Sequence, residues 1–487
     1  MPAISLRRRL ARASLIAALL GAAPAVAADK PATAEGALAL RAFFAKYAPA
    51  AVQGPHPLVA VTPEGADYLL AVDLSALNDL IKETGASYDP ATVLYKLEEQ
   101  DDGKWRVNLE QLPAIGFHAK DATGSFEIQN YRASALIEPT IAWFLSGSSS
   151  AARGAVKIAT AKLAQTIDFD NASAELSTTA RDDGSVSTAV KEEVADIAAT
   201  AKGFGEKNQP INWSARIDKA LIDLGIDGLM SRKAFDLWSL IASHPGRGEL
   251  VGHESAIKGL LKDIAHPGLK IAERVEAQRT VVASAIGAVA LADLKYQIGA
   301  ASMGPQSEVK VGISADGLSL PAGLAPPNAS DLVPSKFDLT VAVKGFDLTA
   351  AADEAIADMR LTEDGPLLSA DDSAKVAAAL LGPGPLRIEI APSHVVAPAL
   401  ALDFDGVVRY ESSKTSASLT IRARGFDKVM TAVKGLDREI QEKALPALAI
   451  AKGFAKTEGD GSLTWAIDVD QDRSITINGI PLGKAPQ

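Results

Sequence analysis

The sequence predicts an α+β protein dominated by an extended antiparallel β-sheet, with helices packed on one face of that sheet. Short segments alternate between apolar and polar residues, which is the period of a strand with one buried face. Asp-Asp-Gly turns at 101–103 and 182–184 join such segments into hairpins. The composition is 47 % hydrophobic but only 5 % aromatic, so the core must use small aliphatic side chains, which bury enough area only over a wide sheet.

A strand, a Gly-Phe-Asp tripeptide and a helical stretch follow one another twice. The alternating segment 339–344 leads into Gly345-Phe346-Asp347, and the segment 419–424 leads into Gly425-Phe426-Asp427. A fainter third copy ends at Gly225-Ile226-Asp227. Glycine permits a bend, and aspartate can accept a hydrogen bond from the first turn of a helix. We therefore predict a sheet built from repeated strand–Gly-Phe-Asp–helix units.

The tripeptides allow a functional and a structural interpretation. In the functional one they line a repeated groove that holds an acyl chain or a partner. In the structural one, which the residue types favour, glycine bends the chain, phenylalanine fills the space between sheet and helix, and aspartate caps the helix. The candidate positions are Gly345, Phe346, Asp347, Gly425, Phe426 and Asp427.

The N-terminus has the parts of an export signal. Four arginines between 7 and 12 precede the apolar segment 13–23 and an Ala25-Val26-Ala27 cleavage box. Residues 1–27 are therefore predicted to be a cleaved signal peptide, and the protein is predicted to be periplasmic. A retained membrane anchor is the alternative, but the apolar segment is well short of the roughly 20 residues of a membrane span. No later segment reaches that length either.

The charge balance bears on possible partners. Loss of residues 1–27 would change the net charge from −11 to −15, because 45 basic residues then face 60 acidic ones. Nucleic acids and anionic lipid head groups attract basic surfaces. The sequence therefore predicts no nucleic-acid partner and makes anionic lipid head groups poor candidates for recognition.

The best candidate for a domain boundary is a loop rich in proline and glycine at 321–335. We predict an N-terminal α+β region over 28–320, this segment as a linker, and a C-terminal α+β region with two repeat units over 336–487.

Local patterns place the elements of the N-terminal region. Helices are expected over 37–47 and 77–81, and the region 227–276 is expected to be mainly helical because apolar residues recur there on one helix face. The Gly/Ser-rich segment 146–150 is expected to be a turn or loop. Alternation predicts strands over 58–62, 68–74, 92–98, 104–109, 126–137, 174–180, 295–298 and 308–314.

The C-terminal region repeats the same kinds of pattern. Helices are expected around 353–359, 374–381, 428–436 and 438–454. Strands are expected over 386–390, 401–410, 462–468 and 474–478.

The sequence contains no recognisable metal-binding or cofactor motif. There is no cysteine, and the histidines at 56, 118, 244, 253, 266 and 394 lack zinc-site spacing. His253-Glu254 does not begin an HExxH helix, because Ile257 stands where the second histidine is required. The acidic segment 468–472 resembles half of an EF-hand loop, but Arg473 stands where glycine is needed. We therefore predict no metal, no cofactor and no catalytic residue.

The overall layout resembles exported protein families of Gram-negative bacteria described as domains of unknown function. The resemblance rests on "GLSLP" at 317–321, "LVPSKFDLTVAVKGFD" at 332–347 and the closing "SITINGIPLG" at 474–483. More distantly, the closing hairpin is similar to that of the YdgA-like periplasmic proteins. The resemblance covers roughly the C-terminal half, and it implies no catalytic residues.

Three hypotheses for function follow. The leading one is a non-enzymatic periplasmic protein that binds a hydrophobic ligand or lipid in a groove of the sheet, because such grooves are apolar with few polar anchors. The alternative is an interaction or scaffold protein of the cell envelope, whose repeat units face a protein partner. The third is a periplasmic hydrolase, for which no G-x-S-x-G segment or other catalytic motif is present.

Overall fold

The computed structural model describes residues 31–484, except 50–51, 55, 82–84, 206–207, 245, 266–267, 302, 305–306, 322, 325–328, 363, 383 and 412–413. The predicted signal peptide lies outside the described residues. The chain divides into two compact units, neither of which is one continuous segment. The first comprises Met1–Asn212, Asp223–Leu269 and Ala352–Ala374, and the second comprises Trp213–Ile222, Lys270–Ala351 and Lys375–Gln487.

The α+β class with a strand-rich antiparallel sheet is confirmed. Strands account for 53 % of the residues and helices for 23 %, and the sheet is open and mostly antiparallel. The segment 321–335, predicted to be a linker, lies within the second unit. Just before this segment, Ser319 forms an antiparallel bridge with Ala290.

In the first unit the chain forms a branched antiparallel sheet. Strand β9 pairs with β10 along one edge, while its other edge is shared between β8 and β7. One branch continues as β8–β5–β4–β2–β1 and the other as β7–β6–β3, and β10 pairs onward with β11. The strands are β1 (Val59–Glu64), β2 (Asp67–Asp73), β3 (Ser87–Tyr88), β4 (Thr92–Glu99), β5 (Trp105–Gln111), β6 (Ile115–Ala119), β7 (Ala122–Gln129), β8 (Arg132–Glu138), β9 (Trp143–Thr160), β10 (Leu163–Ala180) and β11 (Val186–Phe204).

The two predicted hairpins are confirmed. Gly103 joins β4 to β5 with a φ of +79°, and Gly184 joins β10 to β11 with a φ of +81°. Glycine adopts this left-handed conformation without steric cost. The helical elements of this unit are α3 (Ala34–Ala45), η2 (Leu74–Leu77), α4 (Asn78–Ile81), α5 (Ser231–Ser243), α6 (Arg247–Val251) and α7 (Glu254–Ile264).

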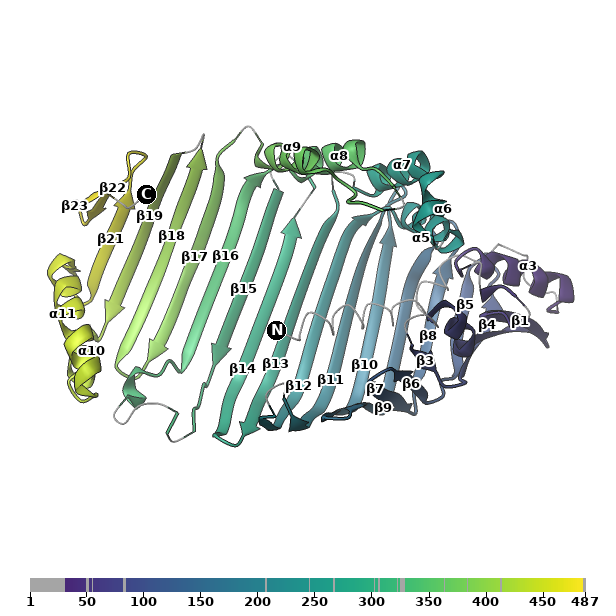
Figure 1. Cartoon of the computed structure of the whole chain (residues 1–487), viewed down its shortest axis with the longest axis horizontal. Coiled ribbons are helices and arrows are strands. Elements are labelled where there is room, and N and C mark those ends of the chain that lie inside the picture. The colour runs from purple at the N-terminus through teal and green to yellow at the C-terminus, as the bar shows by residue number, and fades with distance from the viewer. Residues whose placement is uncertain are drawn as a thin grey trace. The chain divides into compact units, whose positions relative to one another are not determined.

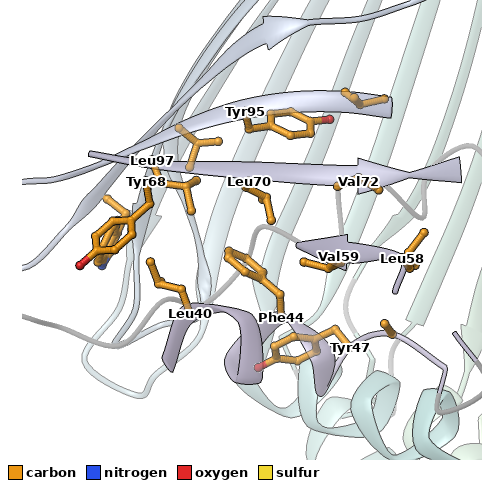
Figure 2. Packing of buried hydrophobic residues seen from close by; sticks show 14 of the residues in the cluster. Leu40, Phe44, Tyr47, Leu58, Val59, Tyr68, Leu70, Val72, Tyr95 and Leu97 are labelled. Carbon is orange, nitrogen blue, oxygen red and sulfur yellow. The ribbon is translucent and has the colours of Figure 1, made fainter. Parts of the chain in front are cut away.

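Helix α3 covers the β1–β2–β4 end of this sheet and forms its main core. The helix begins after Thr33, whose side-chain oxygen accepts a hydrogen bond from the Gly36 amide at 3.0 Å. Figure 2 shows Leu40 and Phe44 of α3 directed toward Leu70 of β2. Leu40, Phe44 and Leu70 are 1 to 2 % exposed, so the apolar face of these strands is fully withdrawn from water.

In the second unit the strands pair mainly in the order of the chain, from β13 to β19, as Figure 1 shows. Strand β19 then pairs with β21, which also pairs with β20 and β22, and β22 pairs with β23. The strands are β13 (Lys270–Ser284), β14 (Gly287–Ala301), β15 (Ser307–Asp316), β16 (Lys336–Phe346), β17 (Leu386–Ala397), β18 (Leu400–Glu411), β19 (Lys414–Arg424), β20 (Lys456–Thr457), β21 (Leu463–Val469), β22 (Ser474–Ile477) and β23 (Ile480–Lys484).

Helices η4 (Ser330–Leu332), α10 (Phe426–Val433) and α11 (Arg438–Phe454) belong to the second unit. Helices α8 (Leu348–Asp358) and α9 (Ala370–Leu381) and strand β12 (Pro210–Leu229) contain residues of both units.

Two sequence predictions are wrong in this part of the chain. The region 227–276 is not helical throughout, because it begins in β12 and ends in β13, with α5 to α7 between. Residues 270–276 include alanine, glutamate and arginine, which favour helices, but pairing with β14 makes them a strand. Similarly, Ser146 to Ser150 form part of β9 and pair with β8 instead of forming a loop.

Truncation of Phe44 tests the role of α3. We expect Phe44→Ala to lower the free energy of unfolding of the first unit by about 3–5 kcal/mol, because it removes a fully buried ring. Leu38→Ala on the same helix should change it by less than about 0.5 kcal/mol, since Leu38 is 65 % exposed. Hydrogen exchange of the whole protein as a function of urea concentration, read out in the peptides that contain β2 and β4, would measure the free energy of unfolding of both variants. Equal effects of the two variants would contradict this account of the core.

The phenol of Tyr95 on β4 makes the stability of this core sensitive to pH in the alkaline range. Burial, followed by the neighbouring Tyr131, raises the pKa of Tyr95 from 10.0 to about 12. The stabilising contribution of the neutral phenol is therefore complete below pH 10 and is lost as the pH rises through about 12. Urea unfolding between pH 9 and 12 should show a smaller loss of stability for Tyr95→Phe than for the unmodified chain. Identical pH profiles would contradict this assignment.

Candidate functional site

The register of the second sheet shows which side chains share a face. Residues directly opposite each other in an antiparallel pair point to the same side of the sheet, and alternate residues of one strand do so too. Following these pairings from β14 to β19 assigns each strand residue to one of two faces.

One face carries four rows of apolar residues that cross β14 to β19, and we call it the apolar face. The first two rows are Ala300, Val309, Val343, Ile388, Val408 and Ala417, and then Ile298, Val311, Val341, Ile390, Gly406 and Leu419. The other two are Tyr296, Ile313, Leu339, Phe404 and Ile421, and then Leu294, Ala315, Phe337, Val395, Leu402 and Ala423. On β17 the third row contains Ser393, which stands opposite Phe404 just after a bulge between Ile390 and Ser393.

All the charged residues of these six strands lie on the opposite face. Lys344 and Glu389 form an ion pair of 2.6 Å across β16 and β17, and Arg424 and Asp403 form one of 3.0 Å across β18 and β19. The hydrogen bond that Lys344 donates to the Glu389 carboxylate raises the pKa of Lys344. The ion pair of Lys344 lies in a shallow hollow of about 510 Å³, whose floor spans β15 to β19. This face is therefore a hydrated, ion-paired surface.

Within the described residues, most side chains of the apolar face on β14 to β17 are partly or well exposed. Val311, Ile313 and Ile388 are 38 to 39 % exposed, whereas Leu70 in the first unit is 1 % exposed. Among the residues that the structure describes, no side chain of β14 to β17 belongs to a cluster of buried hydrophobic residues. These strands therefore present aliphatic side chains to solvent on one side and charges on the other.

At the β19–β21 end, helices α10 and α11 cover the same face. Phe426 and Phe454 pack against Ile421 and Trp465, whose side chains extend the third row onto β21. The indole nitrogen of Trp465 donates a hydrogen bond of 2.7 Å to the carbonyl oxygen of Ala451 on α11. The helix pair is thus fixed in place and closes one end of the apolar face.

The two glycines of the predicted tripeptides make the expected bends. Gly345 and Gly425 have φ values of +82° and +84°. A Cβ atom would lie 2.5 Å from the Pro385 carbonyl oxygen at the first position and 2.3 Å from the Ala399 carbonyl oxygen at the second. Each position therefore requires glycine for both its backbone conformation and its space.

The other residues of the tripeptides behave differently in the two copies. Phe346 is buried at 7 % exposure at the end of β16, and Phe426 packs against Trp465. Asp347 caps α8, accepting a hydrogen bond of 2.9 Å from the Ala350 amide. The cap predicted for Asp427 is wrong, since this residue lies within α10 and pairs with Lys452 at 2.5 Å.

The tripeptides do not come together in one groove. Strands β16 and β19 are separated by β17 and β18 and run in opposite directions, because each neighbouring pair is antiparallel. Gly345 therefore lies beside the start of β17, and Gly425 beside the start of β18, at opposite ends of the strands. The apolar face lies between them. The alternation of apolar and polar residues is present in the sequence of single strands, such as Val309 to Ile313. The alignment of the apolar residues into rows depends on the pairing register between strands, which the sequence of one strand does not encode.

The remaining candidates form no catalytic or metal centre in the described part of the chain. The rings of His244 and His253 lie 4.1 Å apart, and His118 contacts Asp89 at 2.9 Å. No group of three potential metal ligands occurs among the described residues, and His266 lies outside them. Asp470 accepts hydrogen bonds from the amides of Asp472 and Ser474, as in an ordinary turn.

No protein-family model matches the chain, and no curated protein matches it. Within the described residues, no helix is both long and apolar enough to cross a membrane.

The glycine bends can be tested with a matched control on the same sheet. We expect Gly345→Ala and Gly425→Ala each to lower the free energy of unfolding of the second unit by at least about 2 kcal/mol, because both meet a backbone oxygen and a left-handed conformation. Gly299→Ala in β14 should be neutral or stabilising by up to about 1 kcal/mol, since a Cβ there meets no atom within 4 Å. Thermal unfolding followed by circular dichroism would compare them, and a stable Gly425→Ala variant would contradict the bend.

Proposed function

We propose that this chain is an exported, non-enzymatic protein of the periplasm that binds a hydrophobic ligand or lipid on the apolar face of its second unit. The observation that carries the proposal is the apolar face itself: four rows without a charged residue, exposed to water over β14 to β17. An exposed apolar surface of several hundred Å² on a folded protein usually marks an interaction site.

The dimensions of the face support a ligand of lipid size. The four strands β14 to β17, spaced by about 4.8 Å, give a width of roughly 14 Å, and the seven residues from Val309 to Ala315 give a length of roughly 20 Å. The resulting area is roughly 290 Å². Covering it would provide up to about 7 kcal/mol at 25 cal/mol per Å².

The same dimensions bear on the scaffold alternative. A stable protein–protein interface buries about 800 Å² on each partner and has a polar rim around an apolar centre. The apolar face is smaller, and its charges lie on the other side of the sheet. A lipid needs only apolar contact, so we favour the lipid over a protein partner.

In this proposal the repeated units form the boundaries of the apolar face. We propose that each strand–Gly-Phe-Asp–helix segment is one repeat and that the helices belong to one face of the sheet. Two observations support this: both glycines adopt the left-handed conformation within three residues of the start of a helix, and α10 with α11 packs on the apolar face. The resemblance to exported families of unknown function agrees with the same picture.

Two substitutions on the apolar face test ligand binding. We expect Val311→Glu combined with Ile388→Glu to reduce lipid uptake at least tenfold, because two carboxylates would have to be desolvated beneath an acyl chain. Both positions are nearly 40 % exposed, so the fold should tolerate the change. Uptake would be measured as lipid retained by delipidated protein after incubation with phospholipid vesicles and removal of the vesicles.

The control uses the residue that precedes each of these positions in its strand. Lys310→Glu combined with Arg387→Glu adds the same carboxylates to the charged face and should leave lipid uptake unchanged. Absence of lipid uptake by the unmodified protein would remove the proposal. Equal losses in both double variants would also count against it, because the effect would then reflect charge alone.

A further inference from the structure

The apolar face contains almost nothing that could recognise a polar head group. Its four rows between β14 and β19 contain two side chains with a hydrogen-bonding group, Tyr296 and Ser393. The Ser393 hydroxyl at the bulge is 2 % exposed and already donates to the Ala391 carbonyl oxygen at 2.7 Å. The backbone amides and carbonyls are used in the strand pairing. A ligand that carries polar groups must therefore hold them beyond the edge of these rows.

One carboxylate borders the face. Glu273 of β13 stands opposite Ile298 and continues the second row outward. It is the first charged residue met on this side of the sheet when moving from β14 to β13. A partly exposed single charge contributes little selectivity in water with salt present.

The size of the face favours more than one acyl chain. A lipid chain spans about half of a hydrocarbon core of roughly 30 Å, or about 15 Å, so it fits along the roughly 20 Å length of the exposed strands β14 to β17, which together are roughly 14 Å wide. A single chain of this kind is held only weakly, with an association constant of about 10⁴ per molar at a membrane, whereas two chains give stable attachment. The face has room to hold two chains.

We propose that the ligand is a membrane lipid with two or more acyl chains, which the protein recognises by its chains and not by its head group. This inference rests on the proposed function and specifies its ligand class. The chains lie on the apolar face, and the head group stays in water beyond the rows.

A competition experiment on the full mature chain tests this. Delipidated protein is incubated with vesicles containing equal amounts of phosphatidylethanolamine, phosphatidylglycerol and a single-chain lysophospholipid, the diacyl lipids having identical chains. The protein is separated from the vesicles, and its bound lipids are quantified by mass spectrometry. We expect the two diacyl lipids to be bound within about threefold of each other, and the lysophospholipid at least tenfold less.

Each result has a separate meaning. A preference above tenfold between the two head groups would overturn the inference. Loss of that preference in Glu273→Gln would assign head-group recognition to the Glu273 carboxylate. Lysophospholipid bound as well as the diacyl lipids would overturn the requirement for two chains. Binding of no lipid at all would instead remove the proposed function.

Discussion

The second unit depends on the register of its strand pairing. Because side chains alternate between the faces, a shift of one residue between two strands would place one strand's valines and isoleucines among the charges of its neighbour. From β14 to β19 the apolar rows stay aligned through five successive pairings. Only the pairing of β17 contains a bulge within these rows, and Val395 and Leu402 are back in line after it. The separation of charged and apolar faces is thus a result of hydrogen-bond geometry.

Helices decide which parts of the apolar strand faces become core. In the first unit, α3 places Leu40 and Phe44 on β1, β2 and β4, and apolar residues of these strands such as Leu70 and Val93 are buried. In the second unit, α10 and α11 do the same for Ile421 and Trp465. Strands β14 to β17 have the same alternating composition without a helix to cover them. The difference between core and candidate binding surface therefore lies in the covering element and not in the strands.

Much of the architecture could be predicted because it is locally encoded. The Asp-Asp-Gly turns, the bends at Gly345 and Gly425 and the alternation of β15 and β16 are each written within a few residues. The long strands β9 and β13 were missed because their serine, alanine and glutamate residues have no strong strand preference, and tertiary pairing overrides it. The candidate site could not be predicted, since it consists of residues more than 100 positions apart, such as Val311 and Leu419. The Gly-Phe-Asp tripeptides form a repeated motif in the sequence, but they lie at the ends of strands and not on the apolar face.

Pairing in chain order has a consequence for how such a surface can change in evolution. Among the described strands, each from β14 to β18 is paired along its length with its predecessor and its successor, so the sheet is nearly one-dimensional. Duplication of one hairpin would add two strands, and the apolar face would become wider by roughly 10 Å without changing any existing contact except the one at the insertion point. Ligand capacity in a sheet of this kind is therefore set by the number of hairpins, and it can grow or shrink in steps while the fold stays the same.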